Sequence, residues 1–471
     1  MHHQRPFILG TLAIAFLLTL PVLIQDGMFC DAYLYTSVAK NLAHGEGSFW
    51  FPYFDEMNVA NLPSFHEQPP LVFWLESLFF RVFGDSMYTE RIYTLLMMLL
   101  NMLLIKHIWQ LVMPERKQFY WLAILCWITI PVCFWSFHNC MHENTMSVFC
   151  LSAIAASCNV YFKQSKNLLW LLLSGIFVVL AFLSKGLPGL YPLAIPVCLL
   201  LSGQLNFTQT TRDTMLLSSI PIGFAALVWF HPTLHKSIID NYFILRLFQR
   251  VGHAPTVTNR FDTLIRLFTE LIPVLSIGIL LYLISLKQRL STLFFADKKK
   301  VFFFLLLGLC GTLPLMLTSV QKGFYMVAAL PCFGLAFGIW YSAFTEKWID
   351  AFSVKYKATL NRTAYFLCIL SVLLTVFFVG KTSRDHEILH DVYAIGQLVP
   401  SNTYFEVENK QFEDWSFQNY LMRYFHLGVR WKPSNYLVCE KNRKPSDHSR
   451  WERIPMETMR YDFYKLKVLS N

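Results

Sequence analysis

Charged side chains are scarce in this sequence of 471 residues, where Asp, Glu, Lys and Arg together make up 15%. Soluble globular domains carry about 25% charged residues, so this shortage excludes an ordinary soluble protein. Hydrophobic residues account for 55% of the chain and aromatic residues for 16%. The composition is therefore that of an integral membrane protein.

Three other features are missing from the sequence. None of the 11 cysteines belongs to a CxxC pair, and most lie inside apolar runs, so no disulfide framework can be inferred. No small-residue cleavage site follows the first apolar run, 6–24, so we expect a retained span in place of a cleaved signal peptide. No internal repeat is present, which counts against the transporters built from repeats.

Apolar runs of about twenty residues, each long enough to cross the hydrocarbon core of a bilayer, recur along the chain. Together with the first run they predict an all-α polytopic membrane protein with about 11 transmembrane helices. The remaining runs lie near 91–112, 119–137, 143–162, 168–184, 187–203, 213–232, 267–286, 301–318, 323–343 and 363–380.

Lysine and arginine gather in short loops, and these loops predict the orientation of the chain. The positive-inside rule places them, with the N-terminus, in the cytoplasm. We attribute the net charge of +10 to orientation and to contact with anionic membrane lipids, and we expect no nucleic-acid partner. The basic loops lie at 114–117, 162–166, 287–289, 297–300 and 347–362.

Two domains are expected: a transmembrane domain over 1–380 and a small soluble α/β domain over 381–471, on the outer face. The outer loop 25–90 is too long for a mere connector and is expected to carry interfacial helices and function. The outer loop 233–266 is basic and amphipathic. It predicts either a lid over a lipid-phosphate cavity or a passive interfacial helix.

Asp31 and Glu67 are the leading site candidates. Asp31 lies near the start of a predicted short helix, where a carboxylate caps the helix or is stabilised by its dipole. Glu67 precedes the rigid pair 69–70, two prolines that enforce an extended backbone before the next helix. Its plainer interpretation is a loop carboxylate paired with His66 or Arg81.

Further charged residues fall on the same predicted face. Glu143 caps a helix or joins a polar cluster, and Lys185 and Lys322, taken singly, are explained by snorkelling to the headgroups. Charges at membrane depth are costly and usually face a cavity or a partner. Acids and cations on one face are what a site for a phosphate leaving group requires.

The order of several motifs resembles the GT-C membrane glycosyltransferases. More narrowly, over 1–380, the chain is similar to the bacterial relatives of the protein O-mannosyltransferases and of the aminoarabinose transferase that modifies lipid A. The motifs are Asp31 in an interfacial helix, E-x-P-P at 67–70, F-G-x-S-x-x-x-x-R at 83–91, E-N-T-M at 143–146, S-K-G at 184–186 and K-x-x-Y-x-x-x-x-x-P at 322–331.

The resemblance implies an inverting glycosyltransferase of the bacterial cytoplasmic (inner) membrane, with its active site on the outer, periplasmic face. Its donor would be a sugar carried on a polyprenyl phosphate such as undecaprenyl phosphate. Its acceptor would be a glycolipid, a lipid A-type lipid or a protein hydroxyl. Two alternatives stay open: a transporter or flippase of a lipid-linked sugar, and a non-catalytic assembly factor in which the outer acids are dispensable.

The resemblance also implies roles for individual residues. Asp31 would be the general base and Glu67 would hold or orient the site. No cofactor is certain, and a divalent metal at Glu67 is left open. The carrier phosphate would be neutralised by Lys185, Arg250 and Lys322, and supporting positions would be His66, Gln68, Glu143 and Arg91.

The chain departs from the family pattern at two positions. Ala32 stands where the family often has a second acid, and Gln68 stands where the aminoarabinose enzymes have a lysine. These departures put the donor sugar and any bound zinc in doubt.

Overall fold

The computed structural model describes residues 4–55, 64–163, 167–249, 255–287, 297–407 and 414–467. The chain divides into two compact units. The first comprises the residues up to Ile24 together with Ile92–Val379. The second comprises Gln25–Arg91 together with the residues from Gly380 onward, so the long first loop belongs with the C-terminal segment.

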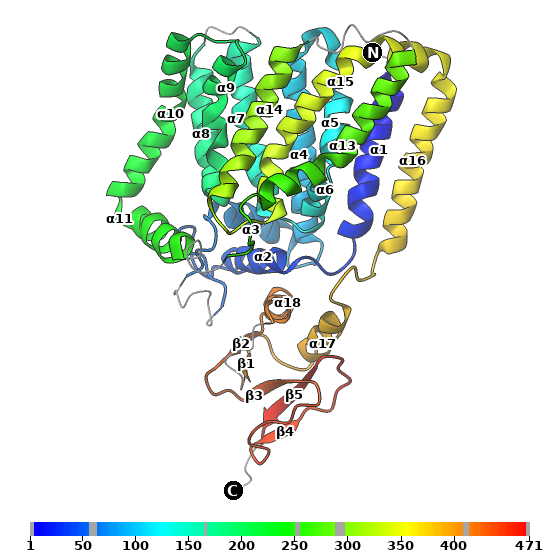
Figure 1. Ribbon diagram of the computed structural model, residues 1–471. Coiled ribbons are helices and arrows are strands. Elements are labelled where there is room, and N and C mark those ends of the chain that lie inside the picture. The colour runs from blue at the N-terminus through cyan, green and yellow to red at the C-terminus, as the bar shows by residue number, and fades with distance from the viewer. Residues whose placement is uncertain are drawn as a thin grey trace. The chain divides into compact units, whose positions relative to one another are not determined.

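The first unit is a bundle of helices in which α1 packs along α16, α7 along α8 and α14 along α15 (Figure 1). Every run predicted as a span coincides with one of these helices or with a consecutive pair of them. The elements are α1 (Arg5–Leu23), α4 (Thr89–Val112), η3 (Pro114–Phe119), α5 (Tyr120–Ile128), α6 (Pro131–His138), α7 (His142–Tyr161), α8 (Leu169–Lys185), η4 (Leu187–Ala194), α9 (Ile195–Leu201), α10 (Phe207–Phe230), α11 (Pro232–Leu234), η5 (His235–Phe248), α13 (Asp262–Lys287), α14 (Lys298–Thr312), η7 (Leu313–Leu317), η8 (Gly323–Ala329), α15 (Leu330–Lys355) and α16 (Lys357–Phe378).

The predicted fold class is confirmed, but the count of about 11 spans is not. Within the described residues, seven helices are long and apolar enough to cross a membrane, or up to eight if one bent pair counts as a span. The shortfall has a physical reason, because α8 and the pair η4–α9 are short and α7 carries many polar residues.

The span predicted over 119–137 is broken in the structure. Helices α5 and α6 meet at an angle of 78°, and Pro131 at the start of α6 has no N–H to continue the α5 ladder. The next amide, that of Val132, donates to Glu270 Oε2 of α13 at 2.7 Å. A carboxylate from a neighbouring helix thus satisfies a backbone donor exposed by the break.

Glycine allows α15 and α5 to approach closely. A Cβ atom on Gly338 would lie 2.8 Å from the Cα of Ala123, and one on Gly334 would lie 2.7 Å from the Cβ of Trp127. The two glycines are four residues apart and therefore share one face of α15. This is the small-residue spacing by which membrane helices pack backbone against backbone.

The Gly338→Val variant should destabilise the bundle by about 1–3 kcal/mol, because the added side chain has no room against α5. The matched control is Gly223→Val in α10, where an added Cβ has no atom within 4 Å. Unfolding in detergent micelles measures both. Equal stability of the two variants would contradict the close contact between α15 and α5.

The second unit combines two helices of the long loop with a small C-terminal sheet (Figure 1). The strand order is β2-β1-β3-β5-β4, in which β1 is parallel to β2 and β3 while the other pairs are antiparallel. The predicted C-terminal sheet is thereby confirmed. The elements are α2 (Cys30–Ala43), α3 (Leu71–Phe83), α17 (His386–Gly396), β1 (Tyr404–Val407), α18 (Trp415–Phe425), β2 (Gly428–Arg430), β3 (Tyr436–Glu440), β4 (Trp451–Arg453) and β5 (Tyr461–Leu466).

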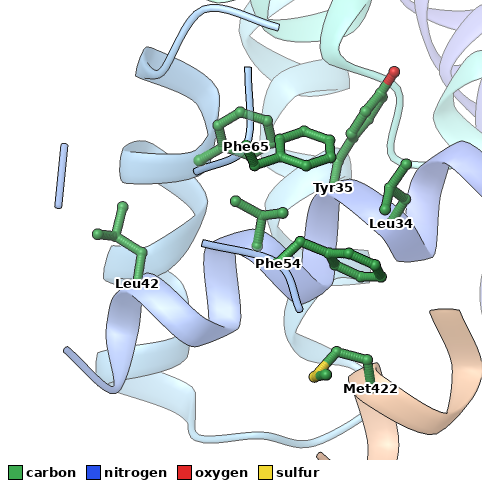
Figure 2. Close-up of a cluster of buried hydrophobic side chains, with 8 residues drawn as sticks. Leu34, Tyr35, Leu42, Phe54, Phe65 and Met422 are labelled. Atoms are coloured by element: carbon green, nitrogen blue, oxygen red, sulfur yellow. The ribbon is translucent and has the colours of Figure 1, made fainter. Parts of the chain in front are cut away.

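One hydrophobic cluster joins the long loop to the C-terminal segment (Figure 2). The sequence analysis placed these two parts in different domains. Their packing buries every residue of α2 from Ala32 to Leu42, including the polar ones. The cluster consists of Leu34, Tyr35, Val38, Leu42, Phe54, Phe65, Phe73 and Met422 of α18.

Candidate functional site

Asp31 occupies the first turn of α2 and is half-buried. It is not the N-cap, because that position belongs to Phe29, whose side chain cannot accept a hydrogen bond. Its carboxylate accepts no hydrogen bond from the part of the chain that the structure describes. The dipole of α2 therefore stabilises an acid that remains available to another molecule.

The segment that carries Glu67 lies beside the same helix. Gln68 Nε2 donates to the hydroxyl of Tyr35 at 3.1 Å, and Tyr35 follows Asp31 by one helical turn. The segment is also fixed at its end, where Pro70 is the N-cap of α3. The two acids therefore come from neighbouring segments of one unit. Arg81, the alternative partner for Glu67, donates to the Leu42 carbonyl.

His66 is a buried neighbour of this segment. Its Nε2 lies 2.7 Å from Ser64 Oγ, and its ring meets Phe51 edge to face at 5.8 Å. Burial lowers the pKa of His66 to about 4, so the ring is neutral at physiological pH. Within the described residues no three His, Cys, Asp or Glu side chains lie where they could hold a metal ion together.

Arg91 ties the end of the long loop to its beginning. Its Nη2 donates to the Gln25 carbonyl at 2.7 Å and to the Tyr33 hydroxyl at 3.3 Å, and its Nη1 lies 3.0 Å from Glu90 Oε1. The side chain is 3% exposed. Arg91 therefore ties together the two ends of the long loop, and its predicted supporting role in the site stays a prediction.

Arg423 of α18, in the C-terminal segment, binds the motif 83–91 that contains Arg91. Its Nη2 lies 2.6 Å from Glu90 Oε2 and donates to the Ser86 carbonyl at 2.9 Å, and its Nη1 donates to the Asp85 carbonyl at 3.1 Å. Both charged side chains are fully buried. Sequence reasoning missed Arg423, because 333 residues separate it from Glu90.

Asp26 is a second position that the sequence did not single out. Its carboxylate accepts hydrogen bonds from the hydroxyls of Tyr33 at 3.2 Å, Tyr393 at 2.7 Å and Tyr424 at 2.5 Å, and from the Gly27 amide at 2.7 Å. Burial raises the pKa of Tyr33 to about 12, so that its hydroxyl keeps the proton it donates. Asp26 thus links the start of the loop to α17 and α18.

In the first unit, Glu143 and Lys185 form a buried ion pair. Glu143 is in the first turn of α7 and Lys185 ends α8, with Lys185 Nζ 3.2 Å from Glu143 Oε1. Their side chains are 0% and 5% exposed, so Lys185 does not snorkel to headgroups. Glu143 is not a cap, because Met141 is the N-cap of α7. The polar-cluster interpretation of Glu143 is the one that fits.

The glycine of the S-K-G motif brings the loop 233–266 next to this pair. Gly186 has φ +83°, and a Cβ atom there would lie 1.9 Å from the hydroxyl of Tyr242 in η5. Only glycine accommodates both the backbone and the ring. Gln321 fixes the C-terminal end of the same loop. Its Oε1 accepts a hydrogen bond from the Thr263 amide at 2.9 Å, and its Nε2 donates to the Arg260 carbonyl at 3.0 Å.

The last two cation predictions have separate outcomes. Lys322 is exposed and is the N-cap of η8, directly after Gln321. Arg250 lies outside the described residues. The proposed phosphate-binding set of Lys185, Arg250 and Lys322 therefore stays a prediction.

Removing the buried Arg423 charge should destabilise the protein strongly. Arg423→Gln leaves Glu90 buried without one of its two guanidinium partners, and the loss of such a partner costs about 3–5 kcal/mol. The control is Arg443→Gln, because that arginine is 57% exposed and pairs at 4.0 Å with exposed Glu440. Unfolding measurements on both variants give the difference. Equal stability of Arg423→Gln and Arg443→Gln would contradict the stabilising role of the Arg423–Glu90 pair.

His66 should make stability depend on pH. The unfolded side chain binds a proton below about pH 6.5, whereas the folded one does so only near pH 4. The free energy of unfolding should therefore fall by about 3 kcal/mol as the pH drops through this window. His66→Gln should flatten the profile, and exposed His448→Gln should not. Identical profiles for both variants would refute the buried neutral ring.

The chain was compared with known proteins. Residues 67–235 match the family model for dolichyl-phosphate-mannose-protein mannosyltransferase. No curated protein sequence is significantly similar to the chain. ArnT from Cupriavidus metallidurans in the apo state has a TM-score of 0.63 and 12% identity, covering 96% of each chain. The same protein bound to undecaprenyl phosphate has a TM-score of 0.61 and 12% identity, covering 96% of this chain and 97% of that chain.

Proposed function

We propose that this chain is a membrane glycosyltransferase of the GT-C type, which moves a sugar from a polyprenyl phosphate to an acceptor hydroxyl; its ArnT-like fold and the family match over residues 67–235 support the proposal. The observation that carries the proposal is Asp31, a half-buried acid not engaged by the described chain, on a helix beside the segment 67–70. The solved ArnT structure holds undecaprenyl phosphate, which supports the same class of carrier here.

Asp31 acts as the general base in this proposal. It takes the proton of the acceptor hydroxyl while the acceptor oxygen attacks the anomeric carbon. The bond between that carbon and the carrier phosphate oxygen breaks, and its electron pair leaves with the phosphate. One displacement of this kind inverts the anomeric configuration and releases the polyprenyl phosphate. Glu67 orients the reacting sugar from the neighbouring segment.

The charge that develops on the departing phosphate needs fixed cations nearby. Lys185 is the best supported, because burial and Glu143 hold its ammonium group in place at the end of α8. Arg250 and Lys322 complete the proposed set. The positive-inside pattern of the loops supports a site on the outer face of the cytoplasmic membrane.

The Asp31→Asn variant tests the general base. It should bind the carrier lipid as the unaltered protein does, but transfer sugar about 10²- to 10⁴-fold more slowly, because an amide cannot take the proton. Exposed Glu440→Gln, in the same unit, is the matched control and should keep full activity. Transfer by purified protein in nanodiscs and direct binding of the carrier lipid give the two readouts.

Sugar transfer retained by Asp31→Asn would contradict the assignment of Asp31 as the general base.

A transporter is the alternative function, and the broken span α5–α6 is the observation that favours it. Proteoliposomes distinguish the two. Movement of the lipid-linked sugar across the bilayer without its consumption would favour transport.

The pair of Glu143 and Lys185 allows a second test. If Lys185 meets the carrier phosphate, Lys185→Gln should raise KM for the donor at least tenfold, and adding Glu143→Gln should not restore it. If the lysine serves only to neutralise Glu143, the double variant should regain normal KM because no buried charge remains. Transfer kinetics at varied donor concentration decide between these outcomes.

A further inference from the structure

The small sheet of the second unit carries an open groove of about 430 Å³. Its lining residues come from the starts of β1 and β3, the ends of β2 and β5, and the segments next to these strands and before β4. None of the predicted site residues lines it. The lining residues are Asn402, Thr403, Tyr404, Arg430, Pro433, Ser434, Asn435, Tyr436, Arg450 and Leu466.

The chemistry of this lining is basic and rich in hydrogen-bonding groups. Arg430 and Arg450 bring two guanidinium groups to the lining. The other polar members are two amides and four hydroxyl-bearing side chains, two of them tyrosines, and these groups pair with hydroxyl groups as well as with oxyanions. Guanidinium groups suit phosphate, because each offers parallel N–H donors.

The two arginines come to the groove with aromatic support. The guanidinium carbon of Arg430 lies 5.4 Å from the centre of the Tyr404 ring, and its Nη2 donates to the Pro433 carbonyl at 3.1 Å. The guanidinium carbon of Arg450 lies 5.2 Å from the centre of the Trp451 ring. Such stacking restricts the side chains before a ligand arrives, which lowers the entropy lost on binding.

The turn between β2 and β3 is also fixed. Ser434 donates through its hydroxyl to the Tyr404 carbonyl, and its amide donates to Glu406 Oε2 at 3.1 Å. Glu406 does not line the groove and is occupied in shaping the turn. The turn that forms this wall of the groove is therefore held in a defined shape.

We propose that this groove binds a phosphorylated saccharide, with the phosphate between Arg430 and Arg450 and the sugar hydroxyls on the amide and hydroxyl side chains. A volume of about 430 Å³ is within the range of small-ligand sites and suits one or two sugar rings. The ligand is either a phosphorylated glycolipid headgroup or a soluble sugar phosphate, which share this chemistry. The proposal is independent of transfer at Asp31, because it concerns binding alone.

The test is direct binding to the full-length protein in phosphatidylcholine nanodiscs. Glucose 6-phosphate should bind at least tenfold more tightly than glucose or inorganic phosphate, and added salt should weaken its binding. Arg430→Gln with Arg450→Gln should raise Kd at least tenfold. Arg450→Gln alone, at an exposed position, should raise Kd without changing the unfolding temperature. Exposed Arg443→Gln, outside the groove, should bind normally.

Two results would overturn the proposal: unchanged binding by the Arg450→Gln variant, or glucose binding as tightly as glucose 6-phosphate. Displacement by phosphatidylglycerol would also overturn it, because that lipid offers a phosphate without a sugar. A lipid A-type glycolipid bearing phosphate identifies the source. Displacement by it supports the membrane-bound ligand, and binding of glucose 6-phosphate without such displacement supports the soluble one.

Discussion

The second unit depends on one buried carboxylate held between two guanidinium groups. Glu90 lies 3.0 Å from Arg91 and 2.6 Å from Arg423, and all three side chains are almost fully buried. Charges removed from water in this way are tolerated only when paired and hydrogen-bonded. Both arginines meet that condition by donating to main-chain carbonyls as well. The motif 83–91 is therefore a fixed junction between the long loop and the C-terminal segment.

Buried hydrogen bonds hold both ends of α2, the helix that carries the candidate base. At the start of α2, Asn419 Nδ2 of α18 donates to the Cys30 carbonyl at 3.1 Å, and Asp26 collects three tyrosine hydroxyls just before it. At the other end, Lys40 Nζ donates to the Arg423 carbonyl at 2.9 Å. Asp31 thus stands on a helix that cannot shift without breaking buried hydrogen bonds, as a positioned acid requires.

Local sequence patterns predicted what local physics determines. Apolar runs predicted the bundle helices, and the prolines before Leu71 predicted the start of α3. Pro131 is a helix-breaking residue, but the apolar run around it predicted one continuous span. The bend of 78° was therefore not predicted. The joining of the long loop to the C-terminal segment could not be predicted, because Glu90 and Arg423 meet only through the fold.

The acids Asp31 and Glu67 belong to the second unit, which contains the Glu90–Arg423 pair, while the Glu143–Lys185 pair belongs to the helical bundle.

The most direct test of the central claim follows the phosphorus and the anomeric carbon of a polyprenyl-phosphate sugar by NMR, with the purified protein in nanodiscs. The account predicts that the phosphodiester becomes a phosphate monoester while the sugar reaches the acceptor with inverted configuration. A retained configuration, or a donor that stays intact in the presence of acceptor, would contradict it.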